Sequence, residues 1–149
     1  YKINDTVTPK ECMQALETLV AKKIDAFYMP SLTCFEWEKF DVNKFLTYLQ
    51  DHKVPTFARQ GSEDVKGGAL MGFSTVDYSQ RGRFIADKMI NILKGESPRK
   101  QAMVDEAPPK IAINLHVAKK IGFDPSFEIL GASDEIYNEV TLPEKRLDK

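Results

Sequence analysis

The stretch with the most conspicuous residue types for chemistry runs from Lys66 to Gly82, KGGALMGFSTVDYSQRG, and holds four of the eight glycines. A phosphate-binding loop needs the spacing G-x-G-x-x-G or G-x-x-x-x-G-K-S/T directly after a strand, because its backbone amides must wrap around the anion. These glycines fit neither spacing, and they precede a strand-like run instead of following one. The stretch therefore does not predict a nucleotide site.

Catalytic and metal-binding patterns are missing as well. The sequence has no G-x-S-x-G nucleophile elbow, and its two histidines, His52 and His116, have no neighbouring triad partners or metal ligands. We interpret both as helix-end or surface side chains. The acidic pairs at 63–64 and 105–106 lie in loop-like stretches and are interpreted as surface charge. We therefore expect a binding protein rather than an enzyme, with no metal and no cofactor.

Composition limits the class of partner. The chain has 149 residues, 42% of them hydrophobic, which suits one globular domain. Its 21 basic and 22 acidic residues give a net charge of −1, so no strong field is present to attract nucleic acid. No apolar run reaches the roughly 20 residues that cross a bilayer. Cys12 and Cys34 are too few for a disulfide framework, and whether they are bonded to each other stays open.

The ends of the chain carry two further expectations. The sequence starts with strand-like residues, without a Met and without the pattern of a signal peptide, so we expect a processed product or a piece of a longer protein. Residues 141–149 are dense in charge and are expected to form a frayed tail.

Helical and strand-like segments alternate along the chain. A Thr8-Pro9-Lys10-Glu11 capping box starts the first expected helix, and Gly95 and Gly122 are expected to end later ones. The expected strands are 24–29, 54–58, 69–74 and 110–114, and the expected helices are 9–20, 42–49, 77–93 and one through 121. This order predicts an α/β fold in three layers, with a doubly wound, mainly parallel sheet covered on both faces. Ligands of such sheets bind beyond the carboxyl ends of the strands, which indicates the loops after Met29, Ala58, Ser74 and Asn114.

The helix expected at 77–93 carries two adjacent apolar rows. Ile85, Met89 and Ile92 form one row, and Ala86, Ile90 and Leu93 form the other. Together they are wider than the stripe of about 100° that one sheet face covers. Either the helix is well buried in a compact domain, or part of this face packs on a partner outside these residues, such as a missing lobe or a second copy of the chain.

Several segments, in a fixed order, resemble a known family. DAFYMP, VPTFA, VKGGALMGFSTVDYSQRGRFIADKMINILKGESP, KIAINLHVAKKIGFDP and LGASDEIY resemble the C-terminal half of the ABC-transporter substrate-binding proteins of the uncharacterised-transport-system type. The resemblance covers Thr8 to about Val140 and implies one lobe of a type I periplasmic-binding-protein-like fold. Residues 1–140 would be this lobe, lacking the N-terminal lobe, and 141–149 the tail. It also implies a bacterial protein, periplasmic or extracellular and membrane-anchored as a lipoprotein.

The resemblance implies a small solute held between the lobes, with docking to an ABC permease. Some relatives take up aromatic amino acids, so an amino acid or another small carboxylate is the expected class of solute. The ligand-binding residues implied are Pro30, Ser31, Leu32, Thr33, Ala58, Arg59, Gln60, Ser74, Asp77 and Tyr78. Asp77 is also expected to cap the next helix, with Gln80 as its capping-box partner.

The loop after Pro30 departs from the family. Relatives often carry a polar string like Thr-Asp-Asn-Thr there, whereas residues 31–34 read Ser-Leu-Thr-Cys, so a ligand ammonium lacks the acidic partner at that position. Phe35, Trp37 and Phe73 are candidates for aromatic faces of the cleft. We interpret Phe73 instead as strand core, and Trp37 has the alternative of a lid over Phe73, which stays open.

Three functions follow in order of preference. The first is a solute-binding component of an ABC-type importer. The second is a ligand-sensing regulatory domain of the same fold, attached to a signalling module. The third is a small α/β enzyme domain, for which no nucleophile, metal or cofactor motif is present in the sequence.

Overall fold

A computed structural model describes residues 8–30, 32–59, 61–74, 78–104 and 110–142. Within these residues, five strands form one sheet in the order β1-β2-β3-β4-β5. The strands are β1 (Phe27–Met29), β2 (Thr56–Ala58), β3 (Met71–Ser74), β4 (Lys110–Asn114) and β5 (Glu135–Tyr137). The first three run parallel, β4 runs antiparallel to β3, and β5 runs parallel to β4. The predicted α/β fold with a mainly parallel sheet is confirmed.

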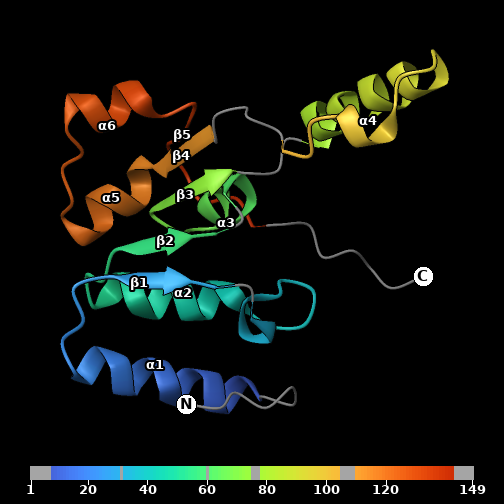
Figure 1. Cartoon of the computed structure of the whole chain (residues 1–149). Helices are drawn as coiled ribbons and strands as arrows, with labels where there is room; N and C mark the ends of the chain where they lie inside the picture. Colours follow the sequence, from blue (N-terminus) through green and yellow to red (C-terminus); the bar gives the residue numbers. More distant parts are fainter. Residues whose placement is uncertain (1–7, 31, 60, 75–77, 105–109, 143–149) are drawn as a thin grey trace.

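Helices flank this sheet on both sides (Figure 1). They are α1 (Pro9–Ala21), α2 (Val42–Asp51), α3 (Ser62–Lys66), α4 (Tyr78–Leu93), α5 (Leu115–Ile121) and α6 (Phe127–Ala132), with 3-10 turns η1 (Thr33–Phe35) and η2 (Pro98–Lys100). The predicted start of α1 is confirmed, because the Thr8 and Glu11 side chains each bond the other's backbone N–H. The predicted inner face of α2 is confirmed too, since Val42, Phe45, Leu46 and Leu49 are all buried.

The main core lies between α2, α3 and one face of the sheet. Met29, Ala58 and Ala112 from three strands form one buried cluster with Leu46 of α2 and Val65 of α3. A second cluster joins α1 to α2, and a third packs α5 on Leu70. These clusters fix the ends of β1 and β2 relative to α3, which is the arrangement that the site below depends on.

One expected ligand loop lies at the wrong end of the sheet. The antiparallel register pairs Met71 with Ile113 and Ser74 with Lys110, so Asn114 lies at the edge opposite the carboxyl ends of β1 to β3. No loop follows Asn114, because α5 begins at the next residue and the Asn114 Oδ1 caps it by accepting from the Val117 N–H at 3.2 Å. The prediction of a ligand loop after Asn114 is therefore wrong.

The opposite edge is instead a structural junction. The buried Asn114 amide donates to the carbonyl oxygens of Val65 at 2.9 Å and Glu139 at 3.0 Å, and the Thr141 N–H donates to the Lys66 carbonyl at 2.9 Å. These bonds hold the segment after β5 against α3. Thr141, expected to begin a frayed tail, is thus bonded to the body of the protein, and residues 143–149 lie outside the described residues.

Candidate solute-binding site

A pocket of about 390 Å³ lies at the carboxyl ends of β1 and β2. Its lining comes from β1 and the segment after it, from the residue after β2, and from α3: Met29, Pro30, Leu32, Phe35, Glu36, Trp37, Glu38, Arg59 and Asp64. The volume falls in the range of roughly 300 to 1,000 Å³ that is usual for small-molecule sites. The expectation of a pocket at this edge of the sheet is met by these residues.

The parallel register brings the two strand ends together. Met29 pairs with Ala58, and the Arg59 N–H continues the ladder by donating to the Met29 carbonyl at 3.4 Å. Pro30 has no backbone N–H to extend β1 and turns the chain away from the sheet. Pro30 and Arg59 therefore lie on neighbouring walls of the pocket, although they are far apart in sequence.

Trp37 and Asp64 are joined by a hydrogen bond within the pocket lining. The Trp37 Nε1–H donates to the Asp64 Oδ1 at 2.8 Å. The indole also lies against Gly67, where a Cβ would come within 2.5 Å of the Trp37 Cζ2. A side chain at position 67 would displace the ring, so this glycine is required for close approach.

Asp64 is buried, so its interpretation as surface charge is wrong, whereas its neighbour Glu63 is exposed as expected. Burial raises the pKa of Asp64 above its ordinary value, because a carboxylate loses hydration in the interior, and the hydrogen bond from Trp37 opposes this shift. The helix α3 that carries both acids is only five residues long and had no periodic signal in the sequence.

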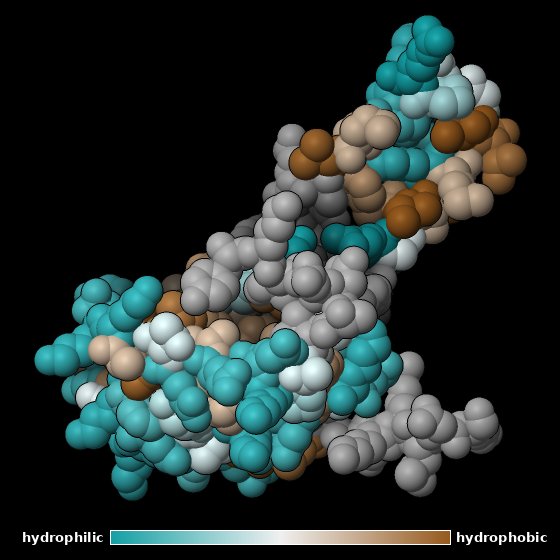
Figure 2. Space-filling view, turned by 90° about the horizontal axis from the view of Figure 1, so that it is seen from below, coloured by the Kyte–Doolittle hydropathy of each residue, from teal (hydrophilic) through white to brown (hydrophobic). Residues whose placement is uncertain are grey.

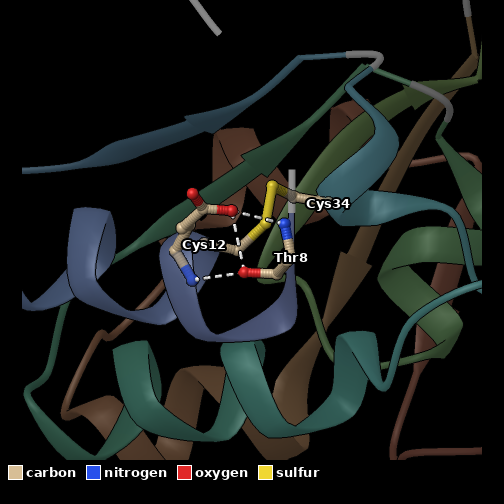
Figure 3. The surroundings of a disulfide bond; sticks show 4 residues. Thr8, Cys12 and Cys34 are labelled. Atoms are coloured by element: carbon tan, nitrogen blue, oxygen red, sulfur yellow. Dashed lines mark hydrogen bonds between the residues drawn. A yellow bond between two sulfur atoms is a disulfide. The ribbon is translucent and has the colours of Figure 1, made fainter. Parts of the chain in front are cut away.

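A disulfide joins Cys12 of α1 to Cys34 of η1, with the Cα atoms 6.1 Å apart (Figure 3). This settles the pairing that the sequence left open. The link holds the segment between β1 and α2 against the first helix, next to the Thr8–Glu11 capping box. Within the same segment the Phe35 ring contacts Phe27 and Phe45, with ring centres 5.6 and 6.4 Å apart.

The pocket contains charges of both signs. Arg59 is exposed at one wall, and three carboxylates belong to the rest of the lining: Glu36, Glu38 and Asp64. Glu36 also forms an exposed ion pair with Lys39, which contributes little to stability. The acidic partner that is missing at residues 31–34 is thus available a few residues later, which sequence reasoning missed because Glu36 and Glu38 follow no motif.

The structure brings together some of the residues predicted to bind the solute. Pro30, Leu32 and Arg59 line the pocket, whereas the buried Ala58 lies in the core beneath it and Thr33 begins η1 without lining the pocket. Ser31, Gln60 and Asp77, with the capping role expected of Asp77, lie outside the described residues, as does the acidic pair 105–106. Ser74 ends β3 and Tyr78 begins α4, but their side chains are not among those described.

Two aromatic interpretations change. Phe73 is 49% exposed, on the opposite face of the sheet from the main core, so its interpretation as strand core is wrong. Tyr28 and Ile136, on the same face of the sheet, are also exposed. Trp37 lies on Gly67 rather than over Phe73.

Helix α4 leaves its apolar face uncovered. Ile85, Met89, Ile90 and Leu93 are 52%, 58%, 47% and 85% exposed. The helix lies apart from the sheet in Figure 1, and Figure 2 shows hydrophobic side chains gathered on its surface. The interpretation of α4 as a helix buried within its own domain is therefore wrong, and the exposed stripe expected as the alternative is present.

Other site types find no support in the described part of the chain. Those residues contain no group of three or more His, Cys, Asp or Glu side chains that could hold a metal ion. None of their helices is both long and apolar enough to span a bilayer. Both histidines are exposed. His52 is the C-cap of α2, and its Nδ1 lies 2.8 Å from the Tyr48 carbonyl oxygen, which agrees with its helix-end interpretation.

Comparison with solved structures identifies the fold. A substrate binding protein with adhesive properties from Clostridium difficile, in a ligand-free, open structure, matches with a TM-score of 0.69 and 24% identity, over 90% of this chain and 43% of that one. The ABC domain in complex with L-Trp from Streptococcus pneumoniae matches with a TM-score of 0.61 and 19% identity, over 87% and 43%. A conserved domain protein from Vibrio cholerae gives 0.61 and 20%, over 88% and 42%. The chain thus spans less than half the length of these structures.

Sequence comparison identifies the family. No curated protein matches the chain. A family model described as ABC transporter substrate binding protein matches residues 5–136, which is most of the chain. This family consists of binding proteins rather than enzymes, in agreement with the expectation from the sequence. The chain therefore belongs to the ABC transporter substrate binding protein family.

Proposed function

We propose that this chain is one lobe of the solute-binding component of an ABC-type importer, and that it captures a small molecule in the cleft between this lobe and another. The observation that carries the proposal is the pocket at the carboxyl ends of β1 and β2, which is concave, partly apolar and lined by charges of both signs. Enclosure between two lobes would supply affinity, and solute binding would favour the closed arrangement.

The division into lobes rests on length and on α4. The chain covers 43% of the Clostridium difficile structure, which is the share expected of about one lobe of a two-lobe protein. Residues 1–140 would form the C-terminal lobe, and 141–149 a charged tail. The exposed apolar stripe of α4 would pack on the N-terminal lobe or, in its place, on a second copy of this chain.

The class of solute follows from the lining. Arg59 can bind a carboxylate, while Glu36, Glu38 or Asp64 can accept from an ammonium group. Phe35 and Trp37 add aromatic surface to the same pocket. We propose an amino acid or another small carboxylate, and L-Trp is the first candidate because the Streptococcus pneumoniae neighbour is a complex with it.

The proposed partners and compartment follow from the family. A substrate-binding protein delivers its solute to an ABC permease, and it works in the periplasm or outside the cell, here held at the membrane by a lipid anchor. The Cys12–Cys34 disulfide supports this compartment, because disulfides persist mainly in oxidising environments.

Isothermal titration calorimetry of the complete gene product against the amino acids and small carboxylates tests this proposal. We expect one solute class to bind, and we expect Arg59→Met to weaken binding of a carboxylate at least about tenfold by removing a charge-assisted contact. Lys119→Met, on the exposed surface of α5 away from the pocket, is the matched control and should leave affinity unchanged. Absence of binding across the panel would contradict the proposal.

A further inference from the structure

We infer that the Cys12–Cys34 disulfide positions the wall of the solute pocket, so that solute affinity depends on this covalent link. The inference rests on the proposed function of that pocket. Of the nine lining residues that the structure describes, six come from the segment that contains Cys34, namely Pro30, Leu32, Phe35, Glu36, Trp37 and Glu38. Whatever fixes this segment therefore fixes most of the surface that the solute would meet.

The segment has little regular structure of its own. Among the described residues between Met29 and Asp41, the one helical element is the three-residue turn η1, and Cys34 is the middle residue of that turn. The segment is held by the disulfide, by the Trp37–Asp64 hydrogen bond, by the ring contacts of Phe35 and by packing of its partly buried aromatic residues on the main core. Of these attachments, only the disulfide is covalent, and it joins the segment to α1 rather than to the sheet.

Packing behind the segment is incomplete. A second pocket of about 180 Å³, lined mainly by apolar side chains, lies between α1, β1 and the segment. Pro30, Leu32 and Phe35 line both pockets, so each lies between the proposed solute site and this second space. Side chains that border this open pocket lack protein partner atoms on that side, so packing alone gives them less resistance to movement. The link from Cys34 to α1 spans this gap.

The other end of the link lies on a helix with few core contacts. Cys12 and Leu16 are the two buried residues of α1, and Met13 and Val20 pack on the same cluster while partly buried, so the disulfide is one of a few attachments of α1 to the core. The capping box of Thr8 and Glu11 makes the first turn of α1 regular, which gives Cys12 a defined position. Breaking the disulfide would thus have two effects at once: it would release the pocket segment from α1, and it would weaken the attachment of α1 to the core.

The chemistry of opening is thiol–disulfide exchange. A dithiol such as dithiothreitol attacks the disulfide as a thiolate, the Cys12–Cys34 bond breaks, and both cysteines become thiols while the reagent closes to a cyclic disulfide. Both cysteines are buried, so the reaction requires local opening. A Cys12→Ala/Cys34→Ala double variant removes the link without any reductant.

Trp37 provides a direct readout, because it is the only tryptophan of the 149 residues and lies in the wall concerned. We expect acrylamide to quench Trp37 fluorescence at least about twofold more strongly in the double variant, and in the reduced chain, than in the oxidised chain. Reoxidation should restore the original value. Val54→Ala, which removes a buried side chain of the same cluster outside the pocket, is the control: it should lower Tm and leave quenching unchanged.

Calorimetry with L-tryptophan on the complete gene product gives the second readout. We expect Kd to rise at least about tenfold in the double variant and on reduction, and to recover on reoxidation. Equal quenching in the oxidised chain and the double variant would overturn the inference, and so would increased quenching with an unchanged Kd. If the oxidised protein binds neither L-tryptophan nor any other solute of the panel, the proposed function fails, while the quenching comparison still decides whether the link positions the segment.

Discussion

Trp37 and Asp64 join two walls of the pocket through one hydrogen bond of 2.8 Å between the indole Nε1–H and a buried carboxylate oxygen. Trp37 belongs to the segment after β1, and Asp64 belongs to the helix after β2. The hydrogen bond therefore ties the position of one wall to that of the other, and the Trp37 ring packs directly against Gly67. A change at either residue is expected to alter the other wall.

The raised pKa of Asp64 makes stability depend on pH. Because burial raises the folded-state pKa above the ordinary value of 3.8, the folded state binds the proton more tightly than the unfolded state does. The contribution of this proton to stability is full below pH 3.8 and is lost as the pH rises through the folded-state pKa. Asp64→Asn keeps an oxygen that can accept from Trp37, and we expect its free energy of unfolding to lack this decline.

Urea denaturation across this pH range measures the difference between the two proteins. Asp25→Asn, at an exposed position, is the matched control and should give a curve parallel to that of the wild type. The burial account of Asp64 fails if the Asp64→Asn curve is also parallel to the wild type.

Gly67→Ala tests the close approach of the indole. An alanine Cβ would lie 2.5 Å from Trp37 Cζ2, so the ring must move, whereas the backbone φ of −75° is compatible with alanine. We expect a loss of about 1–3 kcal/mol in the free energy of unfolding, typical of overpacking, together with a changed Trp37 emission maximum. Gly131→Ala, in α6 with open space around it, should instead stabilise by up to about 1 kcal/mol. An unchanged emission maximum in Gly67→Ala would argue against the contact.

Tyr137 is expected to ionise late. Its hydroxyl donates to Glu135 Oε2 at 2.7 Å, and burial, followed by this hydrogen bond, raises its pKa to about 12. Because the folded-state pKa lies above the ordinary value of 10, stability from this group is present below pH 10 and is lost as the pH approaches 12. An absorbance titration near 295 nm should contain a late component, and Tyr137→Phe should remove it. Loss of an early component instead would contradict the assignment.

The α4 stripe is expected to cause self-association of this chain when it is studied alone. Met89 and Leu93 are 58% and 85% exposed, so replacing both with lysine should reduce association in sedimentation velocity runs and reduce binding of a hydrophobic dye. Tm should stay within a few degrees, because neither side chain is buried. Asp87→Lys, on the same helix, adds positive charge without removing apolar surface and serves as the control. Equal association of all three proteins would show that the stripe is not the contact.

Much of the fold was predictable because its signals are local. The Thr8–Glu11 capping box, the apolar face of α2 and the glycine at position 122, which has a positive φ of 78°, each follow from a few adjacent residues. The strand 110–114 was predicted with its observed bounds. The C-terminal ends of α1 and α2 were harder to predict. The residues that follow these helices with a positive φ are Lys23 and Lys53, whereas glycine is the residue usually found in that conformation.

The features that were missed depend on contacts distant in sequence. The antiparallel direction of β4 is set by pairing with β3 and has no local signal, so Asn114 was assigned to the wrong edge. Asp64 is buried because Trp37, 27 positions earlier, packs over its helix, and an acid next to another acid gives no hint of this. Glu36 and Glu38 line the pocket because they belong to an irregular segment that the disulfide of Cys34 holds in place, and the course of that segment has no local signal in the sequence.

Hydrogen–deuterium exchange with and without the tightest-binding solute of the calorimetric panel tests the central claim most directly. The claim is that the solute binds at the carboxyl ends of β1 and β2. At short labelling times we predict slower exchange in residues 29–38 and 58–65, and unchanged exchange in 113–121 at the opposite edge of the sheet. Protection confined to 113–121, or no protection in 29–38 while the solute is bound, would contradict the account.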